Sequence, residues 1–197
     1  MAKIINLYSM ASRSLCPFGK LAAIAMVIVV MHWGMYTAVA QSSTAVPAAK
    51  GSTDALIPAR SRKPAPDFTL TDVQGRTITL SQYKGKVVLL DFWATTCGGC
   101  KIEIPWYVEF DGKYGGNGLA LIGIDMYGES PGVVKAFMAK SGMKYPVAIG
   151  TDAIGNQFGV KALPLTLLID RSGRIAVSHV GIVNQAEFQQ DIEELLR

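Results

Sequence analysis

The chain has 197 residues, of which 50% are hydrophobic and 17% are charged, so it is too apolar to be disordered throughout. Its formal net charge is +4, but Lys3, Arg13 and Lys20 are the only charged residues before position 41, which leaves 16 basic and 15 acidic residues in the remainder. Because the remainder is almost neutral, a nucleic-acid-binding surface is not expected. Three cysteines are too few for a disulfide-rich scaffold.

Residues 1–40 have the pattern of an export signal. A basic region precedes an uncharged apolar run over 21–31, and the small residues Ala38 and Ala40 stand just before Gln41, as at a signal cleavage site. Counted as a whole, residues 21–40 approach the roughly 20 apolar residues that span a bilayer, so a retained N-terminal membrane anchor is the alternative to a cleaved signal peptide. Either way, we expect an extracytoplasmic domain, in the periplasm or on the outer face of the cytoplasmic membrane.

Residues 41–66 are rich in Ala, Pro and Ser and show no hydrophobic periodicity. This composition is typical of a flexible linker. The folded domain is therefore expected over residues 67–197.

Within this domain, the first strong signals are two short strands, over 68–71 and 77–80, which flank a Gly-containing loop and predict a hairpin. Apolar runs over 86–92 and 118–125 predict strands buried on both faces. A helix is expected over 97–114, kinked at Pro105. Residues 131–140 predict a second helix, which begins with a proline and turns Val133, Val134, Phe137 and Met138 toward the core.

The C-terminal part continues with a strand over 145–149, a short helix over 152–158, a hairpin of strands over 165–170 and 175–180, and a closing helix over 184–197. Strand–helix–strand followed by helix–strand–strand–helix predicts an α/β fold. Its centre is a mixed sheet with helices on both faces.

The CGGC sequence from Cys97 to Cys100 follows the most apolar strand and opens a helix. A zinc site would need further ligands, and Cys16, His32 and His179 are the only other cysteine or histidine candidates, so no metal is expected. A structural disulfide across so short a loop would stabilise the fold weakly. A redox pair fits better, because a helix N-terminus stabilises the thiolate of the first cysteine while the second can resolve a mixed disulfide.

The segment VLLDFWATTCGGCKIEIP resembles the active-site region of the thioredoxin superfamily, in particular that of the exported TlpA/ResA-like thiol–disulfide oxidoreductases. The resemblance covers about residues 65–197. PDFTLTDVQGRTITLSQYKGK is similar to the hairpin that this branch adds, and GVKALPLTLLID is similar to the loop around its cis-proline. The resemblance implies a thioredoxin-like fold with an added N-terminal β-hairpin.

The resemblance also implies roles for four residues. Cys97 would be the nucleophile and Cys100 the resolving thiol, and their redox-active disulfide would take the place of a cofactor. Asp91 matches the acid that thioredoxins bury beneath the resolving cysteine, and an exposed acid at a strand end is the alternative. Glu103 matches an acid one turn beyond Cys100 that could take its proton, and an ordinary solvated helix residue is the alternative.

Further residues match the family's substrate groove. Pro164 corresponds to the cis-proline that follows Leu163. Gly181 corresponds to a glycine that lines the groove, with a strand-end turn as the alternative. Trp93 corresponds to the family's structural tryptophan and is placed with the groove residues, with a plain core position as the alternative.

Two positions depart from the family pattern. Thr96 and Gly99 stand where the family usually has Trp and Pro, which leaves the redox potential open. The predicted function is that of an exported thiol–disulfide oxidoreductase acting as a reductase. Its expected substrates are exported cysteine-containing proteins, apocytochrome c among them, and its electron donor is a membrane thiol reductase. The alternatives are a non-catalytic thioredoxin-fold binding module and a peroxiredoxin-like peroxide reductase, which would place Pro and Thr at Leu90 and Ala94.

Overall fold

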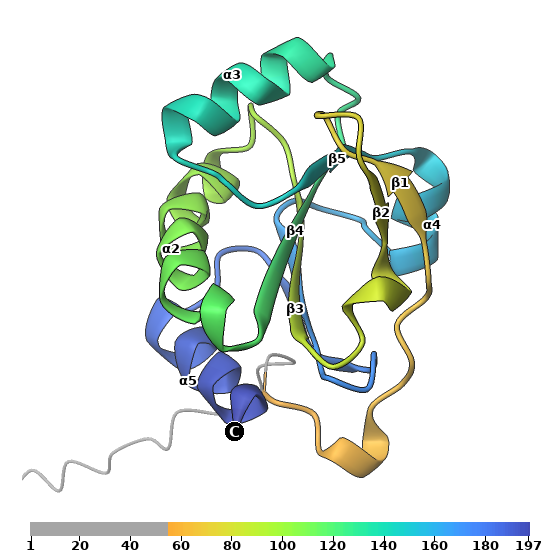
Figure 1. The fold of residues 1–197 in the computed structure, drawn as a ribbon, viewed down its shortest axis with the longest axis vertical. Helices are drawn as coiled ribbons and strands as arrows, with labels where there is room; N and C mark the ends of the chain where they lie inside the picture. The colour runs from red at the N-terminus through yellow and green to blue at the C-terminus, as the bar shows by residue number, and fades with distance from the viewer. Residues whose placement is uncertain (1–54) are drawn as a thin grey trace, which may run out of the picture. The chain divides into compact units, whose positions relative to one another are not determined.

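The structure is a computed structural model that describes residues 55–197 (Figure 1). The predicted signal peptide or anchor over 1–40 and the first part of the predicted linker lie outside the described residues. Within residues 55–197, no helix combines the length and the apolar character needed to cross a bilayer.

A five-stranded mixed sheet forms the centre of the domain, in the order β5-β4-β3-β6-β7. β3 and β5 run parallel to β4, whereas β6 runs antiparallel to both β3 and β7. The bounds are Val87–Trp93 for β3, Leu119–Asp125 for β4, Val147–Ile149 for β5, Leu165–Ile169 for β6 and Ile175–Val180 for β7. A separate antiparallel hairpin is formed by β1 (Thr69–Thr71) and β2 (Thr77–Thr79). The predicted fold class is therefore confirmed.

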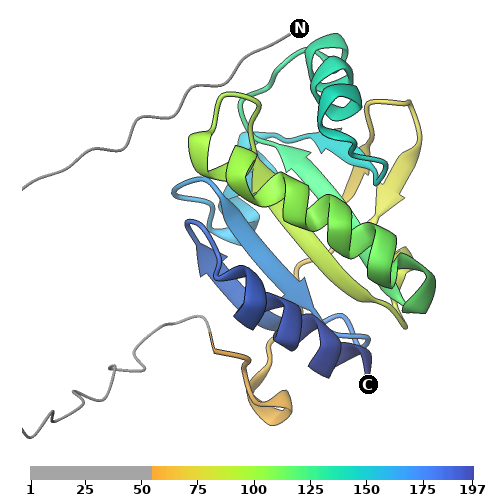
Figure 2. The same ribbon diagram turned by 90° about the vertical axis from the view of Figure 1, so that its left-hand side faces the viewer.

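Helices cover both faces of this sheet. α2 (Gly98–Tyr114) and α5 (Gln185–Leu196) lie side by side on one face, as Figure 2 shows. α3 (Pro131–Ser141) packs into the same hydrophobic cluster. The β1–β2 hairpin and α4 (Asp152–Phe158) cover the other face. The predicted and observed elements agree to within about two residues.

Strand β3 is the central strand of the sheet, and all seven of its residues are buried. Successive side chains of a strand point to opposite faces. Leu89 and Trp93 accordingly pack on the α2 side, whereas Leu90 and Phe92 pack under the hairpin and α4. Asp91 lies between Leu89 and Trp93 in this alternation, so its carboxyl group is on the α2 side.

Val133 differs from the prediction for α3. Val134 and Met138 are buried, but Val133 is 49% exposed. Successive residues of a helix are about 100° apart around its axis, so Val133 lies at the border of the apolar face rather than at its centre.

Residues 57–65, which we call the N-terminal strap, lie along β7. The N–H of Ile57 donates to the carbonyl of Ala176 at 2.8 Å, and the N–H of Ile175 donates to the carbonyl of Lys63 at 2.9 Å. The folded domain therefore starts before residue 67, and the flexible-linker prediction is wrong for the strap. Its Pro- and Ala-rich composition resembled a linker because backbone pairing with a strand requires no apolar pattern.

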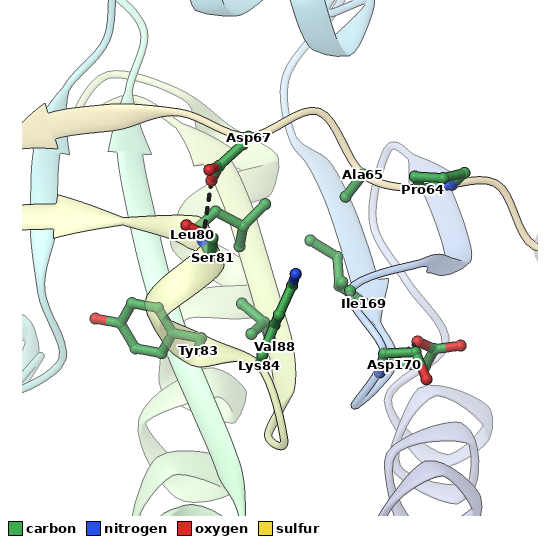
Figure 3. Close-up of a pocket in the computed structure, with 12 residues that line it drawn as sticks. Pro64, Ala65, Asp67, Leu80, Ser81, Tyr83, Lys84, Val88, Ile169 and Asp170 are labelled. Atoms are coloured by element: carbon green, nitrogen blue, oxygen red, sulfur yellow. Dashed lines mark hydrogen bonds between the residues drawn. The ribbon is translucent and has the colours of Figure 1, made fainter.

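A small pocket of about 210 Å³ lies between the strap, the segment after β2 and the start of β3 (Figure 3). The Asp67 carboxylate in this pocket accepts hydrogen bonds from the N–H groups of Phe68 and Ser81, at 3.0 and 2.9 Å. The pocket lies near Val88, at the opposite end of β3 from Cys97. Asp67 thus links the end of the strap to the segment after β2, at a distance from the cysteine pair.

Candidate active site

Cys97 caps the N-terminus of α2. Its backbone is extended, and its sulfur atom accepts a hydrogen bond from the N–H of Cys100 at 3.1 Å. The two cysteines form a disulfide, with their Cα atoms 5.3 Å apart. Cys97 is half-buried, whereas Cys100 is only 1% exposed, under the first turn of the helix. Only Cys97 of the pair can therefore be reached readily by another protein.

The Leu163–Pro164 peptide bond is cis, as the resemblance predicts. Pro164 lies against the CGGC loop, because a Cβ atom placed on Gly99 would come within 3.1 Å of Pro164 Cδ and 3.2 Å of Ile182 Cγ1. The N–H of Gly181 donates to the Pro164 carbonyl at 2.9 Å, and Gly181 has a φ of 95°, a left-handed backbone that favours glycine. The structure thus brings Pro164, Gly181 and the cysteine loop together.

Ile182 was not singled out from the sequence, although its side chain is 46% exposed beside this loop. No pattern distinguishes it, because apolar residues after a strand are common. Trp93 differs from its prediction as a groove residue: it is fully buried and packs on Phe137, with 5.1 Å between the ring centroids. Its large ring fills the space between β3 and α3, so Trp93 supports the site from the core and does not line the groove.

Asp91 is 2% exposed, so the alternative of a water-exposed acid is excluded. Neither of its carboxyl oxygens has a hydrogen-bond partner among the described residues. Burial raises the pKa of Asp91 well above its ordinary value, and the charge of Glu103 raises it further. A carboxylate whose pKa is raised is a stronger base than an ordinary aspartate and can accept a proton from a thiol.

Glu103 is fully buried, so it is not a solvated helix residue. Its Oε1 atom accepts a hydrogen bond from the N–H of Val183 at 2.7 Å, whereas Oε2 has no partner among residues 55–197. Burial raises the pKa of Glu103, and the Val183 hydrogen bond opposes this shift. Asp91 and Glu103 repel each other when both are charged, which favours a state in which the pair retains a proton.

A buried hydroxyl pair beside these acids was missed from the sequence. Tyr107 and Thr166 are both fully buried, and their hydroxyl oxygens are 2.9 Å apart. Thr166 pairs with Asp91 across the sheet, and burial together with the charges of Asp91 and Glu103 raises the pKa of Tyr107 well above its usual value. The position of Tyr107, one helical turn after Glu103, was the available signal.

No group of three or more His, Cys, Asp or Glu side chains within residues 55–197 could hold a metal ion. The described site does bring together the two sulfur atoms of the disulfide and the buried acids. A mixed sheet, a CGGC disulfide at a helix N-terminus and an adjacent cis-proline together define a thioredoxin-fold protein of the thiol–disulfide exchange class.

Comparison with known proteins agrees with this assignment. The AhpC/TSA family model matches residues 62–178. The chain is 34% identical over 132 residues to the thiol-disulfide oxidoreductase ResA of Geobacillus thermodenitrificans. The aligned residues make up 66% of this chain and 75% of that relative. It is 40% identical over 121 residues to ResA of Bacillus thuringiensis, covering 60% of this chain and 69% of that one. A thiol:disulfide interchange protein of the thioredoxin family from Chlorobium tepidum has 29% identity and a TM-score of 0.64, with 69% of this chain and 97% of the other covered.

The chain belongs to the AhpC/TSA family and, within it, to the ResA-like thiol–disulfide oxidoreductases of the thioredoxin superfamily. It is an oxidoreductase that acts through cysteine sulfur and not through a bound cofactor. The peroxide-reductase alternative has little support in the site. Leu90 and Ala94, where that mechanism needs Pro and Thr, are both fully buried and offer no hydroxyl group.

Proposed function

We propose that the protein reduces disulfides in exported cysteine-containing proteins through Cys97 and Cys100. The observation that carries this proposal is the asymmetry of the pair. The accessible sulfur of Cys97 lies at a helix N-terminus. The shielded Cys100 belongs to the hydrophobic cluster that contains Leu89 and Trp93, the neighbours of the buried Asp91 on the same face of β3.

In the first step, the Cys97 thiolate attacks one sulfur of the substrate disulfide. The substrate S–S bond breaks, its second sulfur leaves as a thiolate that takes a proton from water, and a mixed disulfide joins the substrate to Cys97. The N–H of Cys100, 3.1 Å from the Cys97 sulfur, supports this role because it stabilises negative charge there.

In the second step, Cys100 gives its proton to a buried carboxylate and attacks the Cys97 sulfur. The mixed disulfide breaks, the substrate leaves as a dithiol after protonation, and the Cys97–Cys100 disulfide forms, so that two electrons have passed to the substrate. Asp91 is the favoured proton acceptor, because neither of its oxygens is engaged by another described residue. Glu103 is assigned as the second acid of the pair.

The reductive direction has an electrostatic argument. Negative charge on Asp91 or Glu103 disfavours a thiolate nearby, and a dithiol that is poorly stabilised gives up electrons readily. We therefore expect a potential near the roughly −270 mV of thioredoxin and far from the roughly −120 mV of DsbA. Equilibration with glutathione buffers, followed by quantification of the thiols, measures it. A potential near the DsbA value would reverse the proposed direction.

Export, the membrane thiol reductase that supplies electrons and apocytochrome c as one substrate are parts of the same proposal. The basic leader, the apolar run and the small residues before Gln41 support export. A fusion of residues 1–66 to a reporter that needs an oxidising compartment tests it. Reporter activity confined to the cytosol would refute export, and fractionation of an active fusion distinguishes a cleaved signal from an anchor.

A further inference from the structure

A groove of about 720 Å³ lies between α2 and α3. Figures 1 and 2 show α3 near the N-terminal half of α2. Residues at helical spacings of three and four share one face, so one face of each helix supplies a wall. Thr95, two residues before Cys97, also lines the groove, which therefore reaches the loop of the nucleophile. Its helical lining residues are Lys101, Ile104, Pro105, Val133, Ala136, Phe137, Lys140 and Ser141.

The groove combines an apolar surface with positive charge. Ile104 is 1% exposed at its base, and Val133 presents a 49% exposed side chain at its rim. Both charged lining residues, Lys101 and Lys140, are lysines, and neither forms an ion pair with another described residue. α3 itself contains no acidic residue, and the carboxylate of Glu129, just before it, is engaged by the N–H and the hydroxyl group of Thr95.

Pro105 adds a polar feature. Proline has no N–H, so residue 105 cannot donate the usual helical hydrogen bond to the carbonyl of Lys101, four residues earlier. Both residues line the groove. The Lys101 carbonyl is thus left without its usual helical donor, next to an apolar surface.

The proposed reaction brings a partner protein to Cys97, close to this groove. Lys101 is one helical turn from the nucleophile, and its N–H donates to the Cys97 carbonyl at 3.3 Å. A protein joined to Cys97 must continue across a neighbouring surface. From Val133 to Lys140 the α3 wall extends about 10 Å, which accommodates about three residues of an extended chain.

We propose that this groove binds an extended segment of the partner protein close to its reacting cysteine, in which an apolar side chain is flanked by acidic ones. The apolar side chain lies between Ile104 and Val133, and the acidic side chains lie near Lys101 and Lys140. This proposal rests on the proposed function, and it concerns a surface separate from the Pro164 groove.

The test uses two synthetic peptides, each with one cysteine in a disulfide with a fluorescent thiol. One carries Asp-Leu-Asp three residues from the cysteine and the other Lys-Leu-Lys, and each is made with the tripeptide on either side. The reduced protein is assayed at low ionic strength with both peptides and with the neutral bis(2-hydroxyethyl) disulfide. The ratio of the peptide rate to the neutral disulfide rate corrects for changes in Cys97 reactivity.

The acidic peptide should have a ratio about fivefold above that of the basic peptide, and this preference should shrink at high salt because the charges are exposed. Lys140→Glu should abolish the preference. Lys135→Glu is the matched control, since Lys135 is on the same helix but does not line the groove, and it should retain most of the preference.

Equal ratios for the two peptides, or equal losses in the two variants, would overturn the proposal of a groove. If the protein reduces neither the peptides nor the neutral disulfide, the proposed reductase function itself fails. The two failures are therefore distinguishable.

Discussion

Asp91→Asn should stabilise the oxidised protein at neutral pH and slow the resolving step of its reaction. The stabilisation follows from the buried carboxyl group, which is 2% exposed and has no hydrogen-bond partner among the described residues. Asparagine has nearly the same shape as the neutral acid but cannot become charged. The variant therefore separates the cost of the charge from that of the buried side chain.

The magnitude follows from proton linkage. In the unfolded chain the carboxyl group loses its proton near pH 4, whereas burial raises the pKa of Asp91 in the native protein well above this value. Between the two pKa values only the native state keeps the proton, so the free energy of unfolding falls by about 1.4 kcal/mol for each pH unit as the pH rises. The advantage of Asp91→Asn should be near zero below pH 4, grow at this rate and level off above the native pKa.

Urea unfolding of the oxidised protein between pH 3.5 and pH 8.5 measures this difference, and Asp170→Asn is the matched control. Asp170 is bound by Arg62 at 3.1 Å and by Arg174 at 3.4 Å. Hydrogen bonds and these cations lower its pKa although burial opposes them, so its contribution is present above pH 4 and is lost as the pH falls. Asp170→Asn should therefore be less stable than the parent protein at neutral pH.

A parallel pH dependence in the parent protein and Asp91→Asn would refute the reasoning. It would mean that Asp91 has the same pKa in the native and in the unfolded protein. In single-turnover reactions, Asp91→Asn should slow release of the substrate from the mixed disulfide more than formation of that disulfide. Equal rates for both steps in the variant and the parent protein would assign Asp91 a purely structural role.

Three further changes test other parts of the structure. Cys100→Ser should accumulate mixed disulfides with exported proteins on a non-reducing gel and Cys97→Ser should not, because only Cys97 is accessible; equal trapping would reverse the assignment. Gly123→Ala should lower the free energy of unfolding by about 1–3 kcal/mol in urea, because the new Cβ would lie 2.9 Å from Nε1 of the buried Trp93; a loss within about 0.5 kcal/mol would show that the ring can move. Burial and two neighbouring glutamates raise the pKa of Asp191 to about 6, so Asp191 should contribute a loss of stability between about pH 4 and pH 6. Asp191→Asn should remove this contribution and leave that of Asp91; a pH dependence identical to that of the parent protein would refute the shift.

The elements that the sequence predicted best are those with an unambiguous hydrophobic pattern. β3 and β4 are continuous apolar runs, and continuous runs arise where a strand is covered on both faces. The position of Cys97 at the start of α2 followed from its place directly after such a run. Local pattern and tertiary structure agree here, because the buried strand and the helix that follows it leave few alternatives.

The burial of individual helix residues was less predictable. Glu103 reads as a polar residue on a helix, and only the packing of α2 against the residues after β7 buries it and supplies the Val183 N–H. Ile102 shows the converse, since it is 49% exposed although it is an apolar residue of the same helix. Periodicity identifies an apolar face but not its borders, which depend on where the neighbouring elements lie.

The N-terminal strap and the hairpin together cover both outer strands of the five-stranded sheet. The strap pairs with the first part of β7, and on the other side the N–H of Val73 donates to the Val147 carbonyl of β5 at 2.8 Å. Uncovered outer strands have unpaired N–H and carbonyl groups that can pair with another molecule and lead to aggregation. A shortened protein that begins at residue 67 would keep both cysteines of the site but would expose part of β7 to other copies. The segment before the hairpin therefore protects the enzyme from assembling with itself through its sheet.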